Sequence, residues 1–458
     1  MAVINVIKLA KLGGTKRIDP DFYKPEYIID FNKGEWQPLK RFLSNCQYGI
    51  SQAMIEERKG YPIFRMDDIK NCFLSDEEIK YIEIPDNLFR QFKLERDDVL
   101  FNRVNSEEFV GRTGIFKLEG DYVFASYLIR LRTKSNSQIL PDYLNIFLNT
   151  KYGKKQIYRF SRRAVNQANV NAEELKNFRI CLISREIQEK IRRLSNEAWH
   201  NVDLSKSQYI KAEALLLQEL GLKDFKPKYK LSYVANLSEA FDMQRVDAEY
   251  FQPAYEEMIK KIAKNSKIEK LKNIISFINH GKQPYYIEDG EVPVLIQKHL
   301  GSKLLSLYSE IIDSPDTPRT DRKFVNDFPE YRLRIGDILF YSVGAYLGRT
   351  NVVFEDFEAV PASFITLIRA KQEICDPVYL ALFLNSWVGQ MQSERWKSAS
   401  AQQYIYPKEI KRFIIPILPQ KTQAKIASLV QQSHQARKKA KELLEEAKRK
   451  VEEAIENR

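Results

Sequence analysis

The polar residues of this sequence do not form a catalytic pattern. No glycine-rich loop is followed by Lys-Ser or Lys-Thr, the pattern that cradles nucleotide phosphates. Asp376-Pro-Val-Tyr379 departs from the Asn/Asp-Pro-Pro-aromatic motif of amino-methyltransferases and is typical of a helix start. Fragments such as Glu78-Ile-Lys80 resemble half of a nuclease motif, but they arise by chance in a chain with 29% charged residues. The sequence therefore favours a reader over an enzyme.

Loops rich in Arg, Lys, Gln, Asn, Tyr and Ser could bind nucleic acid instead. Arg and Lys side chains hydrogen-bond to guanine, Asn and Gln to adenine, and Ser and Lys to phosphates. Any one of them could also cap a helix or support a loop. The candidate DNA-binding residues are Tyr48, Ser51, Arg65, Asn102, Arg103, Asn105, Arg112, Arg162, Arg163, Gln167, Lys282, Gln283, Gln297, Lys298, Tyr341, Ser342, Arg349, Lys397, Gln402 and Gln403.

Two stretches of the chain repeat each other at long distance. Residues 98–113 and 337–350 both predict a strand, a polar loop, and Gly-Arg-Thr opening a second strand. Their offset is 337 − 98 = 239, and the Arg-x-Asp boxes at Arg17 and Arg245 are 245 − 17 = 228 apart. Solenoid units repeat every roughly 20–50 residues. A whole domain is therefore duplicated.

The arginines of the two Gly-Arg-Thr sequences are expected to share one job. Arg112 and Arg349 occur in both copies, whereas two different half-sites should be read by residues that differ. We expect them to give internal support or contact a phosphate, without reading sequence.

Each repeat ends in a long predicted helix. Apolar residues recur at three- and four-residue steps from Ile187 to Leu220 and from Ile426 to Ala454. The simplest interpretation of the second helix alone is a solvent-exposed tail that packs on nothing. Because a matching helix ends the first repeat, we expect the two helices to pack on each other.

Composition predicts a folded, basic, cytoplasmic chain. Its 458 residues suggest two or three domains, and 44% hydrophobic residues suggest packed cores. The net charge of +12 favours a polyanionic partner such as nucleic acid, although solubility alone could explain it. Four scattered cysteines and four scattered histidines predict reduced thiols and no zinc site. We expect neither a signal peptide nor a membrane span.

Taken together, several of these sequence segments resemble those of the DNA specificity subunit of type I restriction-modification systems. The resemblance rests on residues 99–106 and 110–113, residues 337–344, the paired Arg-x-Asp boxes, and the helix entries at residues 187–191 and 418–426. It covers nearly the whole chain. It implies an α+β fold with two duplicated target-recognition domains separated by two long helices that form an antiparallel coiled coil. The predicted segments are a lead-in (1–16), domain 1 (17–184), a central helix (185–222), a linker (223–244), domain 2 (245–419) and a C-terminal helix (420–458).

The resemblance also implies a function and partners. Each domain would read one half of a bipartite, asymmetric site in double-stranded DNA, and the chain would catalyse nothing itself. Two methyltransferase subunits, and restriction or translocase subunits, would assemble with it. No cofactor is expected on this chain, whereas S-adenosylmethionine, ATP and Mg²⁺ are expected on the partners. The alternatives are a self-contained restriction or methylation enzyme and a coiled-coil scaffold that binds only proteins.

Overall fold

The computed structural model describes residue 17 and residues 19–164, 167–300, 317–398 and 402–457. The predicted lead-in, residues 1–16, lies outside this part. The described chain divides into two compact units. Unit 1 comprises the residues up to Val202 together with those from Lys439 onward, and unit 2 comprises Asp203 to Lys438. Each repeat therefore forms a unit that also contains part of both long helices.

The main sheet of unit 1 has six strands in the order β2-β11-β7-β9-β5-β4. These are β2 (Leu43–Tyr48), β11 (Leu128–Thr133), β7 (Val99–Asn102), β9 (Thr113–Ile115), β5 (Phe73–Leu74) and β4 (Ile69–Lys70). A smaller sheet joins β10 (Val123–Phe124), β3 (Tyr61–Phe64) and β6 (Lys80–Ile82), and a third joins β12 (Arg162–Ala164), β13 (Gln167–Asn169) and β8 (Val104–Asn105). β1 (Trp36–Pro38) pairs with β14 (Arg179–Cys181). The helices are α1 (Asp86–Phe92), α2 (Pro141–Leu148), α3 (Lys151–Phe160) and α4 (Ala172–Lys176).

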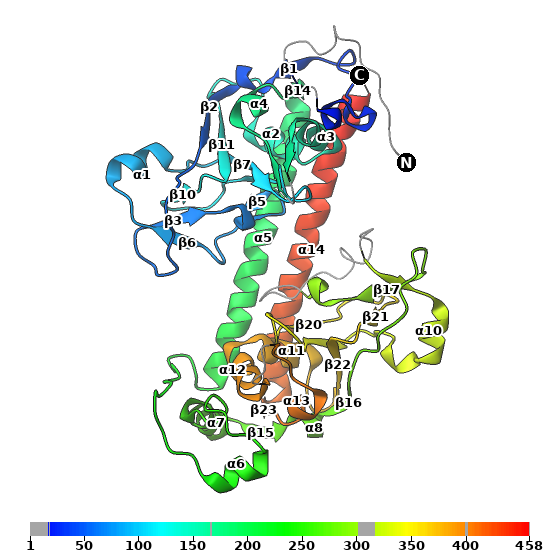
Figure 1. The fold of residues 1–458 in the computed structure, drawn as a ribbon. Helices are drawn as coiled ribbons and strands as arrows, with labels where there is room; N and C mark the ends of the chain where they lie inside the picture. The colour runs from blue at the N-terminus through cyan, green and yellow to red at the C-terminus, as the bar shows by residue number, and fades with distance from the viewer. Residues whose placement is uncertain (1–16, 18, 165–166, 301–316, 399–401, 458) are drawn as a thin grey trace. The chain divides into compact units, whose positions relative to one another are not determined.

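Unit 2 repeats this plan (Figure 1). Its main sheet has the order β16-β22-β19-β20, namely β16 (Ile275–His280), β22 (Ile365–Ala370), β19 (Ile338–Tyr341) and β20 (Thr350–Val352). The smaller sheet joins β18 (Arg319–Thr320), β17 (Val292–Leu295) and β21 (Val360–Pro361), while β15 (Lys267–Lys270) pairs with β23 (Ile414–Ile417). The helices are α6 (Leu237–Met243), α7 (Pro253–Asn265), α8 (Leu271–Ile274), α10 (Arg322–Asp327), α11 (Pro377–Asn385), α12 (Trp387–Trp396) and α13 (Pro407–Ile410).

The two long helices are α5 (Arg185–Glu219) and α14 (Gln420–Glu456). In unit 1, Ile191 of α5 shares a hydrophobic core with Leu444 and Val451 of α14. In unit 2, Leu216 of α5 shares a core with Ile426 of α14. The start of α5 therefore packs with the end of α14, and the reverse holds at the other ends, which makes the pair an antiparallel coiled coil as predicted.

Buried glutamines attach each long helix to its own unit. The Gln188 side-chain oxygen accepts from the backbone N–H of Leu140 (2.8 Å), and its nitrogen donates to two carbonyls. Gln423 repeats this with the N–H of Asp376 (2.8 Å) and two carbonyls. Both glutamines are 1% exposed. The same side chain therefore fixes the start of each helix.

The Arg-x-Asp boxes form a second shared joint. Arg17 makes two hydrogen bonds to Asp19 (2.8 and 2.6 Å), and Arg245 makes two to Asp247 (2.7 and 2.8 Å). Each arginine also donates to a backbone carbonyl at the end of α3 or just after α12. The repeated sequence thus encodes a repeated framework.

Candidate nucleic-acid interface

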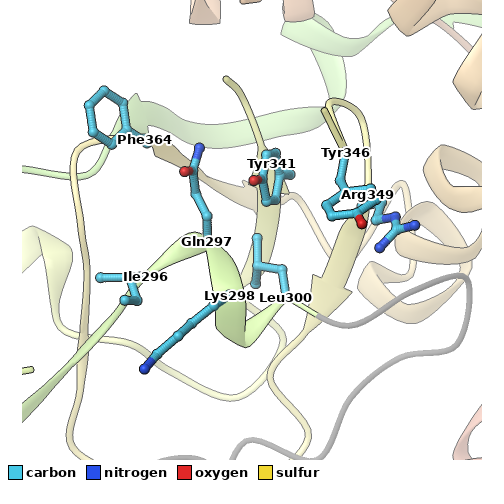
Figure 2. A pocket seen from close by; sticks show the side chains of 8 residues that line it. All are labelled: Ile296, Gln297, Lys298, Leu300, Tyr341, Tyr346, Arg349 and Phe364. Carbon is cyan, nitrogen blue, oxygen red and sulfur yellow. The ribbon is translucent and has the colours of Figure 1, made fainter. Parts of the chain in front are cut away.

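An open pocket in unit 2 lies beside the Gly-Arg-Thr turn (Figure 2). Its volume is about 720 Å³. Three aromatic residues, two cationic residues and a glutamine are among those that line it. The lining residues are Ile296, Gln297, Lys298, Leu300, Tyr341, Tyr346, Arg349 and Phe364. Rings and cations together suit a ligand that combines flat apolar faces with negative charge.

The Arg349 guanidinium is held against an aromatic ring in this pocket. Its central carbon lies 3.7 Å from the centroid of the Tyr346 ring, a cation–π contact. The loop turns at Gly348, whose φ of 89° suits glycine, and the Thr350 hydroxyl donates to the Gly348 carbonyl (3.0 Å). This turn gives a reason for the recurrence of Gly-Arg-Thr, because the glycine allows the turn and the threonine hydrogen bond fixes the backbone on both sides of the arginine.

Unit 1 builds the same turn. The central guanidinium carbon of Arg112 lies 3.8 Å from the Phe109 ring centroid, Gly111 has a φ of 79°, and the Thr113 hydroxyl donates to the Gly111 carbonyl (3.1 Å). The Arg112 side chain is 49% exposed. Of the two jobs expected for these arginines, internal support is the less compatible with such exposure.

A short 3₁₀ turn follows the central strand of each smaller sheet. In η5 (Met66–Asp68), the Asp68 carboxylate accepts from the backbone N–H of Arg65 (2.7 Å). In η6 (Gln297–His299), Nδ1 of His299 accepts from the N–H of Ile296 (3.2 Å). Burial, together with the Lys298 charge, lowers the pKa of His299 to about 4, so the ring is neutral at pH 7 and can accept. Both turns are therefore fixed from inside.

Exposed aromatic residues complete the surface, and the sequence search missed them. Tyr127 is 48% exposed just before β11, and Phe364 is 51% exposed just before β22. Each follows Ala-Ser in the chain, at Ala125 and Ala362. This repeated Ala-Ser-aromatic tripeptide was the signal that would have found them.

Two predicted contact residues are corrected by the structure. Asn102 and Ser342 are both 0% exposed. Asn102 ends β7, and its amide donates to the Phe109 carbonyl (3.1 Å). Ser342 follows β19 and donates to the Phe340 carbonyl (3.2 Å). The prediction that they bind DNA is wrong because these positions point into the unit and hold the loop.

Three predicted arginines carry bonds within unit 1. Arg65 makes two hydrogen bonds to Asp68 (3.2 and 3.0 Å) and one to the Glu78 carbonyl. Arg162 pairs with Glu174 (3.1 Å). Arg163 pairs with two carboxylates, at 3.0 and 2.6 Å. The charges of Arg65 and Arg163 are thus largely engaged internally, whereas the Arg162 side chain is still 67% exposed.

The remaining candidates lie on the surface or at its edge. Tyr48 is 37% exposed, and the Arg103 guanidinium carbon sits 4.8 Å from its ring centroid. Tyr341 is only 9% exposed, although it lines the pocket. Exposed or half-buried positions are also occupied by Ser51, Asn105, Gln167, Lys282, Gln283, Gln297, Lys298, Lys397, Gln402 and Gln403.

The described residues give little support to other site classes. They contain no group of three or more His, Cys, Asp or Glu side chains that could hold a metal ion. The four cysteines are free thiols as predicted, and burial raises the pKa of Cys46 to about 11 and of Cys375 to about 12. Across the part of the chain that the structure covers, no helix has the length and apolarity of a membrane span.

Comparison with known proteins gives a family and two curated relatives. The family model of the type I restriction modification DNA specificity domain matches residues 42–196 and 259–449, well over half of the chain. A putative type I restriction enzyme MjaX specificity subunit of Methanocaldococcus jannaschii is 28% identical over 184 residues, covering 38% of this chain and 43% of that protein. The type I restriction enzyme EcoKI specificity subunit of Escherichia coli K12 is 24% identical over 158 residues, covering 34% and 33%. The aligned parts thus span less than half of either relative.

A solved structure is similar at low identity. The crystal structure of the type I restriction-modification system S subunit from M. genitalium is 10% identical, covers 94% of this chain and 97% of its own, and has a TM-score of 0.46. The family match includes one segment in each repeat, at residues 42–196 and 259–449. The chain therefore belongs to the family of type I restriction-modification DNA specificity domains.

Proposed function

We propose that this chain is the DNA specificity subunit of a type I restriction-modification complex and is not itself an enzyme. Each unit would read one half of a bipartite, asymmetric site in double-stranded DNA. The observation that carries this is the Arg-on-aromatic turn, present in both units at 3.8 and 3.7 Å, beside loops that differ between the units. An arginine turn that is common to both units, beside loops that differ between them, suits the binding of two different half-sites.

Affinity and sequence choice then come from different residues. Arg112 and Arg349 would neutralise backbone phosphates, which positions the DNA without reading it. Tyr127 and Phe364 are exposed aromatic residues, and Phe364 lines the same pocket as Arg349. The net charge of +12 supports this assignment, since phosphate contacts supply most of the sequence-independent affinity.

Methyltransferase subunits are the proposed main partners. Each unit contains its own stretch of both long helices, so the chain offers two similar docking surfaces and we propose two methyltransferases per chain. S-adenosylmethionine would bind to those subunits. Restriction or translocase subunits, with ATP and Mg²⁺, would join the same complex.

Mapping methylated adenines in cells with and without this chain tests the proposal. We expect one bipartite motif to be methylated only when the chain and its methyltransferase are both present. Methylation that persists without the chain would contradict a specificity role. Methylation by the purified chain alone would point to a self-contained enzyme, and a complex without sequence preference would point to a protein scaffold.

A further inference from the structure

We infer that the tips of the η5 and η6 turns set the base specificity of the two units, with Asp67 reading a cytosine and Lys298 a guanine. This inference rests on the proposed function. The two residues occupy equivalent positions in the two units, but their side chains carry opposite charges. Asp67 was not among the residues predicted from the sequence to bind DNA.

The two positions are structurally equivalent. In unit 1, β10 pairs in parallel with β3, with Phe124 opposite Phe64; in unit 2, β21 pairs in parallel with β17, with Pro361 opposite Leu295. The offset along β3 and β17 is 295 − 64 = 231, and the same offset relates the two turns because 298 − 67 = 231. Each tip residue thus stands three places after an equivalent strand residue, in a turn fixed by the same internal hydrogen bond.

The surroundings of the two tips also correspond. Lys298 lines the pocket with Arg349 and Phe364 (Figure 2). The equivalent residues of unit 1 are Arg112 and Tyr127, since 349 − 112 and 364 − 127 both equal 237. In unit 1, η5 leads directly into β4, which joins the main sheet through β5 next to β9, and Arg112 immediately precedes β9. In unit 2 the tip and the arginine proposed to contact a phosphate therefore line one pocket, and their equivalents in unit 1 lie at the ends of nearby strands of one sheet.

The residue types at the two tips differ, although the residues around the tips are equivalent in the two units. Unit 1 has Met66 and Asp67, whereas unit 2 has Gln297 and Lys298. Both tip residues are exposed. A carboxylate beside DNA phosphates is repelled by them, and a hydrogen bond that it accepts from a base can offset this repulsion. An exposed aspartate at this place is thus hard to explain as a phosphate contact, and it fits a residue that selects sequence.

The chemistry of each tip indicates a base. A carboxylate only accepts hydrogen bonds, and in the major groove the cytosine N4 amino group is its usual donor. A lysine ammonium only donates, and guanine offers the O6 and N7 acceptors. Gln297 donates to the Val343 carbonyl (2.6 Å), which holds its side chain within the unit and leaves Lys298 as the tip.

The test uses the whole chain co-expressed with its methyltransferase subunits, and the methylated motif is sequenced. Asp67→Asn should replace cytosine by adenine, or relax it, at one position of one half-site, because an amide pairs with adenine. Lys298→Gln should replace guanine by adenine at one position of the other half-site. The preference for the original base should fall roughly tenfold or more.

Matched variants separate base reading from a general loss of affinity. Glu119→Lys and Lys267→Asp change the charge at sites 92% and 73% exposed and should leave the motif intact. Arg112→Ala should weaken binding to every sequence alike and lower the salt slope by about 1. A uniform loss of this kind in Lys298→Gln would make that tip a phosphate contact and overturn the inference. A uniform change of affinity in Asp67→Asn, with the motif unchanged, would show that Asp67 reads no base and would overturn it as well.

The motif of the unaltered chain separates a failure of the proposed function from a failure of this inference alone. If it yields no motif, the proposed function fails and the inference fails with it. If it yields a motif that both conservative variants leave unchanged at every base, only the inference is overturned. A motif with cytosine altered in one half and guanine in the other supports both.

Discussion

Unit 1 has a charged cluster where unit 2 has two apolar residues and a glycine. In unit 1, the Lys117 ammonium lies 2.6 Å from Asp97 and 3.0 Å from Asp142, and Lys117 and Asp142 are 4% and 1% exposed. Burial raises the pKa of Asp142, and the Lys117 charge opposes that rise. The residues of unit 2 at the positions of Lys117, Asp142 and Asp97 are Phe354, Val378 and Gly336.

This contrast shows which parts of the repeat are constrained. Asp97 and Gly336 both have positive φ, 72° and 86°, so the turn is kept although the residue type is not. The helix-anchoring Gln188 and Gln423 keep their bonds in both units. The residues that attach the helices are the same in both units, whereas the residues at the charged cluster differ. This is expected of units that each have a core of their own.

The largest effect should come from removing one member of the charged cluster. Lys117→Met leaves Asp142 buried without its cation, and we expect the free energy of unfolding of unit 1 to fall by about 3–5 kcal/mol. Urea unfolding followed by tryptophan fluorescence, in a chain with Trp387→Phe and Trp396→Phe so that only Trp36 and Trp199 emit, measures this. A loss below about 1 kcal/mol would contradict the importance of the pair.

The matched variant copies unit 2 into unit 1. Lys117→Phe combined with Asp142→Val removes both charges, and replacing a buried ion pair by apolar residues is often neutral. We expect this double variant to be more stable than Lys117→Met. If it is the less stable of the two, the interiors of the units are not interchangeable at this place.

A smaller effect should depend on pH and on unit 2. His434 stacks on Phe354 (4.2 Å between centroids), and burial lowers its pKa to about 4, although the Glu355 carboxylate opposes this. A folded-state pKa below the unfolded 6.5 means stability that is complete above pH 6.5 and lost as pH falls toward 4. The loss should reach about 3 kcal/mol for a shift of this size.

Unit 1 has Trp199 at the position of His434, so this pH dependence should be confined to unit 2. Urea unfolding at pH 7 and pH 4.5, followed by tryptophan fluorescence in a chain with Trp36→Phe and Trp199→Phe so that only Trp387 and Trp396 emit, measures it. His434→Phe should make the pH dependence about half as steep, because His299 has a similarly lowered pKa and remains, while the pair of Glu355 with Lys438 (2.8 Å) is kept. An unchanged slope in His434→Phe would assign the effect to other groups.

The smallest effect should be equal in the two units. Gln188→Ala and Gln423→Ala each leave one buried N–H and two carbonyls without their partner, and we expect each to cost about 1–3 kcal/mol. Unfolding of the two variants under one set of conditions gives the comparison. Losses that differ by more than about 2 kcal/mol would show that the shared joint is not equivalent.

The sequence predicted the framework well because framework residues recur. The Gly-Arg-Thr turns, the Arg-x-Asp boxes and the two long helices all appear twice, and a repeated pattern is visible without any structure. The helix starts at Arg185 and Gln420 follow from the same repetition. The structure supplies the reason, since these are the residues that make the joints and turns.

The interior and the reading surface could be predicted only in part. Lys117, Asp142 and Asp97 are far apart in the chain, so no local pattern shows that they meet. Asn102 and Ser342 have side chains typical of an interface, yet strand pairing turns them inward. Asp67 is acidic, and a search for basic and amide side chains passes over it.

Domain exchange followed by motif sequencing tests most directly whether each unit reads its own half-site. Residues 245–419 are replaced by the same domain of a family member with a different motif, and methylated adenines are mapped in cells that contain the chimera and its methyltransferase. We predict that one half of the bipartite motif changes and the other stays the same. A motif in which both halves change, or neither does, would contradict two independent readers.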